Sequence, residues 1–176
     1  PRTPAECGRP IGRGTSMTRY CLIPATLCIL CAGGAVAETT WNQPGKGTGV
    51  TKASTVEIAE GHSLMQISST YDTVEMQDAS HPMHGAAGPC FGSVEISGTA
   101  VSGSGVCAFT DSGGDKVVLH WTADAMEASG AMAGNWTLTG GTGKWAEAEG
   151  GGTYSSLADP ASGTFVNTIT SKLTLP

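Results

Sequence analysis

The segment from residue 88 to residue 115 constrains the fold more than any other part of the chain. Two runs of β-forming residues flank Gly98-Thr99, and glycine at the first of two central positions is typical of a type II′ hairpin turn. Counting outward from this two-residue loop places Cys90 opposite Cys107 in a non-hydrogen-bonded pair, where Cα atoms lie about 4.5 Å apart. A disulfide tolerates that distance. Because neither cysteine was used to choose the register, we predict a disulfide-linked antiparallel hairpin.

The same register predicts which face of the hairpin is buried. Val94, Ile96 and Val101 share one face with both cysteines, whereas serines and Glu95 dominate the other face, so we expect the cysteine face to point inward. Three glycines also lie on it: Gly92, Gly103 and Gly105. Glycine within a strand gives up side-chain packing and marks a bend or the close approach of another group. We interpret the three as barrel curvature; the alternative is a floor left open for a ligand.

Residues 17–37 have the organisation of a secretory signal peptide. One basic residue, Arg19, precedes an apolar run, and residues 35–37 have the small-x-small pattern that signal peptidase cuts. We predict cleavage after Ala37 and export to the periplasm or the medium. The apolar run is too short to span a bilayer. The alternative is a lipoprotein, since Cys28 and Cys31 lie here, but both follow leucine rather than a small residue.

The remaining chain divides into an extension, an arm and a domain. Residues 1–16 carry three of the four arginines, and we expect them to be a disordered extension or translated upstream sequence. Residues 38–50 are rich in glycine and lack periodicity, which predicts a flexible N-terminal arm that Trp41 packs against the body. Residues 51–176 are long enough to form one domain.

Cleavage at the predicted site would remove most of the positive charge. All four arginines lie before Glu38, so the mature chain would keep five lysines against fourteen acidic residues. Nucleic acid and anionic membrane surfaces are poor partners for such a surface, and bidentate arginine clamps on carboxylate or phosphate are excluded. Of the six cysteines only Cys90 and Cys107 would remain, and an oxidising compartment favours their disulfide.

Strand-like runs recur through the mature chain between glycine-rich turns. Besides the hairpin we expect six strands, at residues 53–59, 63–76, 115–122, 132–139, 150–156 and 163–173. The longest loop is expected at residues 77–89, and a single helical turn at residues 125–128. Many short strands with glycine-rich turns favour a sandwich or a closed barrel. We predict an all-β fold, a single eight-stranded antiparallel β-barrel with short loops.

Several glycine-rich segments match a known family. Gly-Gly-Thr-Gly-Lys-Trp at residues 140–145 leads into Gly-x-Gly-x-Tyr at residues 150–154. Cys-x-Gly at residues 90–92, Gly-x-Gly-x-Cys at residues 103–107 and Asp-x-x-Gly-Asp-Lys at residues 111–116 precede them. Together these segments resemble the bacterial allene-oxide-cyclase-like β-barrel family.

The resemblance covers roughly residues 55–173. It implies an exported eight-stranded antiparallel barrel of the calycin type, in a family mostly of unassigned function. Plant cyclases of this fold act on a fatty-acid epoxide, and dirigent proteins of similar fold steer phenoxy radical coupling. The catalytic positions of neither group can be matched here, and the mature chain lacks the arginine typical of dirigent-like sites. The resemblance therefore supports a fold rather than an activity.

Three motifs suggest ligand sites but fit ordinary turns better. In the glycine-rich segment at residues 138–145, Lys144 is followed by Trp145 instead of the Ser or Thr of a phosphate-binding loop. Residues 111–115 lack the oxygen ligands of a calcium loop, and we expect their aspartates to accept local backbone hydrogen bonds. His81 and His84, in a chain with several methionines, are weak candidates for a soft metal such as copper. We assign no metal and no cofactor.

The sequence indicates a pocket more clearly than a catalytic centre. It contains no Gly-x-Ser-x-Gly elbow, and we assign no catalytic residue. An acid or base inside the barrel would have to come from the strand carboxylates, whose usual place is a solvated outer face: Glu57, Asp72, Glu75 and Glu95. An apolar and aromatic set is expected to line a pocket: Leu119, Trp121, Trp136, Leu138 and Tyr154. Eight strands enclose room for side chains or for one small ligand, and side-chain filling is the commoner case.

These observations favour the binding of a small apolar or amphipathic ligand in the barrel mouth, without assigned catalysis. One alternative is an isomerase or cyclase acting on a lipid-like epoxide, which predicts an inward carboxylate beside the aromatic residues. Another is a structural or interaction role of the outer surface, which predicts a filled barrel and a large exposed apolar patch. A homo-oligomer is compatible with each of these functions.

Overall fold

The computed structural model describes residues 38–176. The predicted signal peptide at residues 17–37, its cleavage site and the expected extension at residues 1–16 lie outside the described residues. No helix of residues 38–176 has the length and apolar character needed to cross a bilayer.

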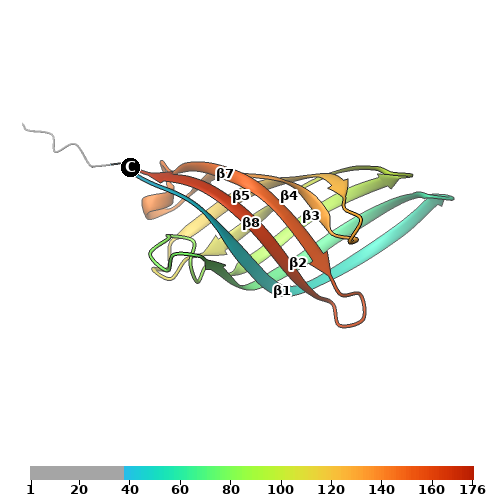
Figure 1. Cartoon of the computed structure of the whole chain (residues 1–176), viewed down its shortest axis with the longest axis horizontal. Helices are drawn as coiled ribbons and strands as arrows, with labels where there is room; N and C mark the ends of the chain where they lie inside the picture. The colour runs from blue at the N-terminus through green and yellow to red at the C-terminus, as the bar shows by residue number, and fades with distance from the viewer. Residues whose placement is uncertain (1–37) are drawn as a thin grey trace, which may run out of the picture. The chain divides into compact units, whose positions relative to one another are not determined.

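Eight antiparallel strands close into a barrel, as the sequence predicts (Figure 1). The strands are β1 (Thr39–Ala59), β2 (His62–Met76), β3 (Gly88–Ser97), β4 (Ala100–Thr110), β5 (Lys116–Met126), β6 (Met132–Gly141), β7 (Glu149–Ala158) and β8 (Thr164–Leu175). Each strand pairs with the next, and β8 pairs back onto β1. A short 3-10 helix, η1 (Gly143–Trp145), lies between β6 and β7.

The β3–β4 hairpin has the predicted register throughout. Cys90 pairs with Cys107, and their sulfur atoms form a disulfide across a Cα–Cα distance of 4.0 Å. Gly98 has a φ of 61°, which the two-residue turn requires. The cysteine face is the buried one, as Val94 at 2% exposure shows, whereas Phe91 on the opposite face is 52% exposed. The observed register matches the predicted one because no bulge interrupts this strand pair, unlike β1–β2 and β5–β6.

The inward glycines of the hairpin make room for a side chain of the neighbouring strand. Trp121 of β5 lies opposite Gly105, and a Cβ atom at either Gly92 or Gly105 would overlap its indole ring. The indole is 8% exposed and therefore fills the space that the glycines leave. The alternative of a floor left open for a ligand is thus wrong at these two positions, and curvature alone is an incomplete explanation.

The predicted flexible arm at residues 38–50 is wrong. Residues 39–50 form the first half of β1 and pair continuously with β8, from Thr39 opposite Leu175 to Val50 opposite Thr164. Glycine and proline suggested an arm, but pairing with the last strand satisfies the backbone groups that an arm would expose to water. Trp41 packs against the core, as expected.

The expected helical turn at residues 125–128 is absent. β5 continues to Met126, with a register shift between Ala123 and Ala125, and a hairpin turn follows. Hydrogen bonds from the Glu127 N–H to the Ala131 carbonyl and from the Gly130 N–H to the Glu127 carbonyl close that turn. Strand pairing with β6 therefore overrides the local helical tendency.

The two ends of the barrel differ (Figure 1). The closed end consists of residues 77–87, 111–115 and 143–145. Within it, Met83 and Ala86 are buried, and the loop at residues 77–87 exchanges backbone hydrogen bonds with Val74 of β2. The open end consists of the four hairpin turns between β1 and β2, β3 and β4, β5 and β6, and β7 and β8.

Candidate ligand-binding site

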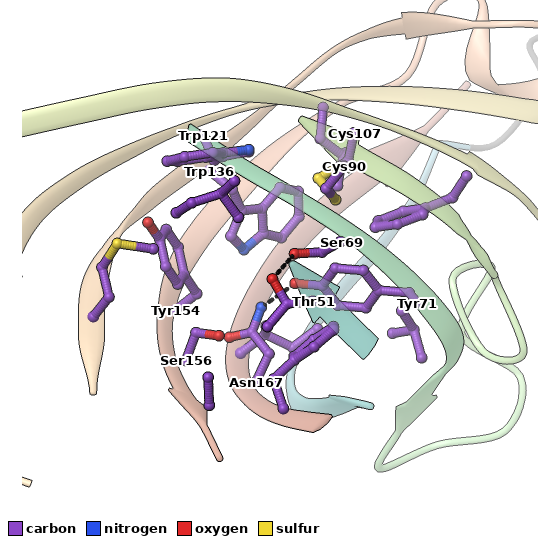
Figure 2. A pocket seen from close by; sticks show the side chains of 18 of the residues that line it. Thr51, Ser69, Tyr71, Cys90, Cys107, Trp121, Trp136, Tyr154, Ser156 and Asn167 are labelled. Carbon is purple, nitrogen blue, oxygen red and sulfur yellow. Dashed lines mark hydrogen bonds between the residues drawn. A yellow bond between two sulfur atoms is a disulfide. The ribbon is translucent and has the colours of Figure 1, made fainter. Parts of the chain in front are cut away.

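A cavity of about 250 Å³ lies inside the barrel, with walls from all eight strands (Figure 2). Met83 of the closed end contributes to one part of the wall. The residues that line it toward the open end are themselves exposed: Ala53, Met126, Gly130 and Ala158. The cavity therefore opens between the hairpin turns. An apolar cavity of about 150 Å³ holds benzene, so this one accommodates a molecule larger than a single aromatic ring.

Four of the five predicted pocket residues line this cavity: Leu119, Trp121, Trp136 and Tyr154. Trp121 and Tyr154 meet edge to face, with ring centroids 6.4 Å apart. The Trp136 indole N–H donates to the carbonyl of Thr170, so its polar edge is satisfied. Leu138 is buried in the core, but it does not line the cavity.

Much of the cavity wall was not predicted from the sequence. All five methionines of the described residues line the cavity: Met65, Met76, Met83, Met126 and Met132. A second aromatic cluster joins them, in which the Tyr71 ring contacts Phe109 and Phe165 at centroid distances of 5.0 and 4.7 Å. The period-2 alternation of Met65, Ile67, Ser69 and Tyr71 along β2 is the signal that would have found part of this set.

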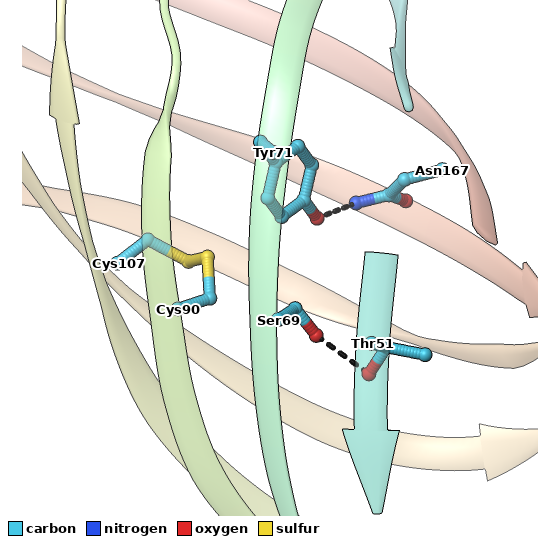
Figure 3. The surroundings of a disulfide bond; sticks show 6 residues. All are labelled: Thr51, Ser69, Tyr71, Cys90, Cys107 and Asn167. Carbon is cyan, nitrogen blue, oxygen red and sulfur yellow. Dashed lines mark hydrogen bonds between the residues drawn. A yellow bond between two sulfur atoms is a disulfide. The ribbon is translucent and has the colours of Figure 1, made fainter. Parts of the chain in front are cut away.

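Two hydrogen-bonded pairs of polar side chains lie on the cavity wall. Ser69 Oγ donates to Thr51 Oγ1 at 2.8 Å, and Asn167 Nδ2 donates to the Tyr71 hydroxyl at 2.6 Å (Figure 3). Burial raises the pKa of Tyr71 to about 12, although the bond from Asn167 opposes that shift. The phenol is therefore neutral at physiological pH.

Two buried polar atoms of the wall have no partner among residues 38–176. They are the Tyr154 hydroxyl and the Asn167 Oδ1 atom. Tyr154 is 8% exposed and Asn167 is 6% exposed. Burial raises the pKa of Tyr154 as well, so its hydroxyl remains a neutral donor and acceptor. A buried polar atom without a partner is costly, so these two oxygen atoms reduce the stability that burial of their side chains provides.

The disulfide also faces the cavity. Cys90 and Cys107 line the wall, and Figure 3 shows them next to the strand that carries Ser69 and Tyr71. Both cysteines are 6% exposed. The hairpin cross-link is therefore part of the wall of the candidate site.

The two candidate metal ligands at the closed end are used for hydrogen bonding within the fold. His81 is 2% exposed, and its Nδ1 accepts a hydrogen bond from the Met83 N–H at 3.1 Å. The ring proton therefore lies on Nε2, which is 3.3 Å from Ser171 Oγ. Burial lowers the pKa of His81 to about 4. His84 Nδ1 accepts from the Met76 N–H at 3.2 Å. No cluster of three His, Cys, Asp or Glu side chains occurs in the described part of the chain.

The glycine-rich segment at residues 140–145 and the turn at residues 111–115 are joined by the buried carboxylate of Asp111. Asp111 Oδ1 accepts from the Gly113 and Asp115 N–H groups, as the turn interpretation predicts. Its Oδ2 accepts from the Trp145 indole at 2.8 Å and from Lys144 Nζ at 2.6 Å. Burial opposes ionisation, but these four donors hold the pKa of Asp111 below its ordinary value. The carboxylate thus joins two loops of the closed end.

Charged side chains stay outside the cavity. The four strand carboxylates are exposed: Glu57, Asp72, Glu75 and Glu95. The five lysines are exposed as well: Lys46, Lys52, Lys116, Lys144 and Lys172. In residues 38–176 the cavity wall includes no Asp, Glu, Lys, Arg or His side chain. The site therefore supplies neutral hydrogen bonds and apolar surface, without a carboxylate or imidazole for acid–base chemistry.

Comparison with known proteins identifies the fold but no family. No protein-family profile and no curated protein matches the chain. Among solved structures, the barrel is similar to the pterocarpan synthase dirigent protein GePTS1, with a TM-score of 0.50 and 15% identity, covering 78% of this chain and 91% of that one. The likeness shows the fold alone at this identity. Membership of the allene-oxide-cyclase-like family is not confirmed.

Proposed function

We propose that this protein is exported and binds a small apolar or amphipathic molecule in its barrel, with binding rather than catalysis as its role. The open cavity, whose wall is mainly apolar, carries the proposal. Interiors packed only for stability approach the density of organic crystals and leave few voids larger than a water molecule. A preformed apolar hollow with a few polar groups is instead the usual form of a small-molecule site.

The composition of the wall supports the same role. Methionine is unbranched and polarizable, so it adapts to ligands of irregular shape. Tryptophan and tyrosine supply large contact areas at Trp121, Trp136 and Tyr154. With five exposed lysines and no arginine in residues 38–176, we propose neither nucleic acid nor an anionic membrane surface as a partner.

The two alternative functions have less support. An epoxide cyclase was expected to place a carboxylate beside the aromatic residues, and the described wall has none. A purely structural role was expected to accompany a filled barrel, and the barrel contains a cavity. Exposed apolar cross-strand pairs do exist on the outer surface: Phe91 opposite Val106, Val56 opposite Leu64 and Leu157 opposite Val166.

Intrinsic tryptophan fluorescence tests the proposal directly, because Trp121 and Trp136 line the cavity. The purified protein is titrated with hydrocarbons, fatty acids, long-chain alcohols and phenolic compounds. We expect saturable quenching or a spectral shift with at least one of these classes. A flat response throughout the panel would contradict the proposal.

Two adjacent serines of β2 provide a matched pair of variants. Ser69 lines the cavity, whereas Ser68 is exposed on the outer face of the same strand. Ser69→Phe fills the cavity and is expected to abolish the response, and Ser68→Phe is expected to preserve it. Equal loss of the response in both variants would place the bound molecule outside the barrel.

A further inference from the structure

We propose that two copies of this protein pair edge to edge through residues 53–57 of β1 and form an antiparallel dimer. The pairing of β1 with β8 ends at Val50 opposite Thr164, whereas its pairing with β2 continues to Ala59. Among residues 38–176, no strand pairs with the other side of residues 52–59. Figure 1 shows this part of the β1–β2 hairpin extending beyond the turn between β7 and β8.

The backbone groups that point to this free edge can be identified from two contacts at its start. The Thr51 N–H donates to the Gly163 carbonyl at 2.7 Å, so it points away from β2. Thr51 lies opposite Ser69 of β2, and the hydrogen bond between their hydroxyls fits the close side chains of a non-hydrogen-bonded pair. Because the two kinds of pair alternate, every second residue after Thr51 points its N–H and C=O groups to the free edge. These residues are Ala53, Thr55 and Glu57.

The free edge lacks the features that usually prevent the addition of another strand. Native proteins protect edge strands with proline, with bulges, or with a covering loop or helix. Residues 52–57 contain no proline, and the nearest register shift beyond Thr51 lies after Glu57. Within the described chain, all residues from 52 to 59 are exposed. The edge is therefore available for pairing with another strand.

A second copy of the same edge satisfies these backbone groups completely. Antiparallel pairing about a twofold axis at Thr55 places Thr55 opposite itself and Ala53 opposite Glu57 of the other copy. Residues of a hydrogen-bonded pair exchange both of their N–H···O=C bonds, so every edge N–H and C=O of this segment gains a partner. Such an interface uses the same surface on both copies, and it closes after two of them.

The charges of the edge permit this self-pairing. Residues 38–176 hold five lysines and fourteen acidic residues, so most of the surface of one copy repels another. Residues 52–57 carry one charge of each sign, Lys52 and Glu57. In the dimer Glu57 faces Ala53, and Lys52 lies beyond the outermost bonded pair. No two like charges are therefore opposite each other.

Apolar side chains on the outer face favour a second copy over an unrelated extended segment. Val56 pairs with Leu64 of β2, and the two residues are 57% and 45% exposed. In the dimer Val56 lies opposite Ser54 and diagonal to Val56 of the other copy, within reach of a cross-strand contact. The Val56–Leu64 pairs of the two copies thus lie on either side of the axis, and pairing covers apolar surface that water otherwise contacts.

Sedimentation velocity of the purified protein, over a concentration series up to about 1 mM, measures the association. We expect a reversible equilibrium between monomer and dimer. A protein that stays monomeric throughout the series would overturn the inference. A trimer or a larger species would overturn it as well, because twofold pairing of this edge stops at two copies. No ligand is added, so the result does not depend on the proposed function.

Opposite charges at position 53 provide a matched pair of variants. Ala53→Lys places a lysine opposite Glu57 on both sides of the axis and should tighten the dimer about three- to thirtyfold. Ala53→Glu places a second carboxylate there and should weaken it by a similar factor. Ser112→Glu adds the same charge in an exposed turn of the closed end and should have a smaller effect. Changes of the same sign in both position-53 variants, or an equal loss in Ser112→Glu, would exclude this edge as the interface.

Amide hydrogen exchange locates the pairing residue by residue. The N–H groups of Ala53, Thr55 and Glu57 point to the free edge, whereas those of Ser54 and Val56 point toward β2. A higher protein concentration should slow exchange in the first set and leave the second set unchanged. Thr55→Pro removes an N–H from the free edge, a position at which a strand tolerates proline, and should abolish the concentration dependence. Equal slowing in both sets, or a dimer retained in Thr55→Pro, would contradict the pairing.

Discussion

The closed end of the barrel and the cavity wall differ in the hydrogen bonding of their buried polar groups. At the closed end, the Asp111 carboxylate accepts four hydrogen bonds and both ring nitrogens of His81 are engaged. In the cavity, the Tyr154 hydroxyl and Asn167 Oδ1 have no partner in the described chain. All four residues are less than 9% exposed, so burial does not explain the difference. The comparison indicates that hydrogen bonding of buried polar groups is complete for Asp111 and His81 at the closed end and incomplete for the two residues of the cavity wall.

The largest effect is expected at the closed end, from Trp145→Ala. The Trp145 side chain is fully buried at 0% exposure, and its indole N–H binds Asp111. Truncation of a buried tryptophan costs about 3–5 kcal/mol, and the Asp111 carboxylate would lose a donor. Urea denaturation of both proteins measures the loss. A change below about 1 kcal/mol would show that this end does not stabilise the barrel.

Removal of the disulfide tests whether the cavity wall contributes stability of its own. The cross-link joins residues 17 apart in sequence, and closing a loop of that size stabilises the folded state by about 3 kcal/mol through the unfolded chain. We expect Cys90→Ala/Cys107→Ala to lower the free energy of unfolding by that amount. Reduction of the wild-type protein should reproduce the effect, and an unchanged urea midpoint would contradict it.

The pH dependence of stability tests the closed end without truncation of a side chain. Burial lowers the pKa of His81 from 6.5 to about 4, so the unfolded chain binds a proton between these values that the folded chain excludes. Stability should therefore be complete above pH 6.5 and fall as the pH decreases toward 4, by up to about 3 kcal/mol. His81→Gln should flatten the profile in this window. An equally steep profile in the variant would assign the effect to another group.

The smallest effect on stability is expected in the cavity, from Tyr154→Phe. Removing an unpaired buried hydroxyl is nearly neutral or stabilising by up to about 1 kcal/mol. The counterpart at the closed end, Trp145→Phe, removes a bond to a carboxylate and should destabilise by about 1.5–3 kcal/mol. Thermal or urea denaturation compares the two variants. Equal destabilisation would remove the distinction between the two regions.

Much of the fold could be predicted because its decisive signals are local. The turn at Gly98 and the alternation of the flanking strands determine the pairing of Cys90 with Cys107, since strand pairs have a strict period of two. The prediction was wrong for residues 38–50, because their pairing with β8 depends on residues more than 100 positions away. A glycine-rich segment without periodicity contains no local sign of such a partner.

The site was only partly predictable. Trp121, Trp136 and Tyr154 were expected to line a pocket, and they line the cavity. The methionines suggested a soft metal, whereas the structure distributes them over the cavity wall. The unpaired atoms of Tyr154 and Asn167 could not be identified, because the presence of a hydrogen-bond partner depends on the register of β7 and β8 and on the position of Tyr71.

By itself, the sequence determined the all-β class and the closure of the hairpin by a disulfide. Each of these follows from spacing along a single strand or a single turn. Only the tertiary structure decided that the barrel is hollow and that Trp121 occupies the space above Gly92 and Gly105. It also decided that the Tyr154 hydroxyl and Asn167 Oδ1 have no partner among residues 38–176. The physical reason is that cavities and unsatisfied hydrogen bonds depend on how side chains from all eight strands fill a common volume. No pattern within one strand or one turn specifies that arrangement.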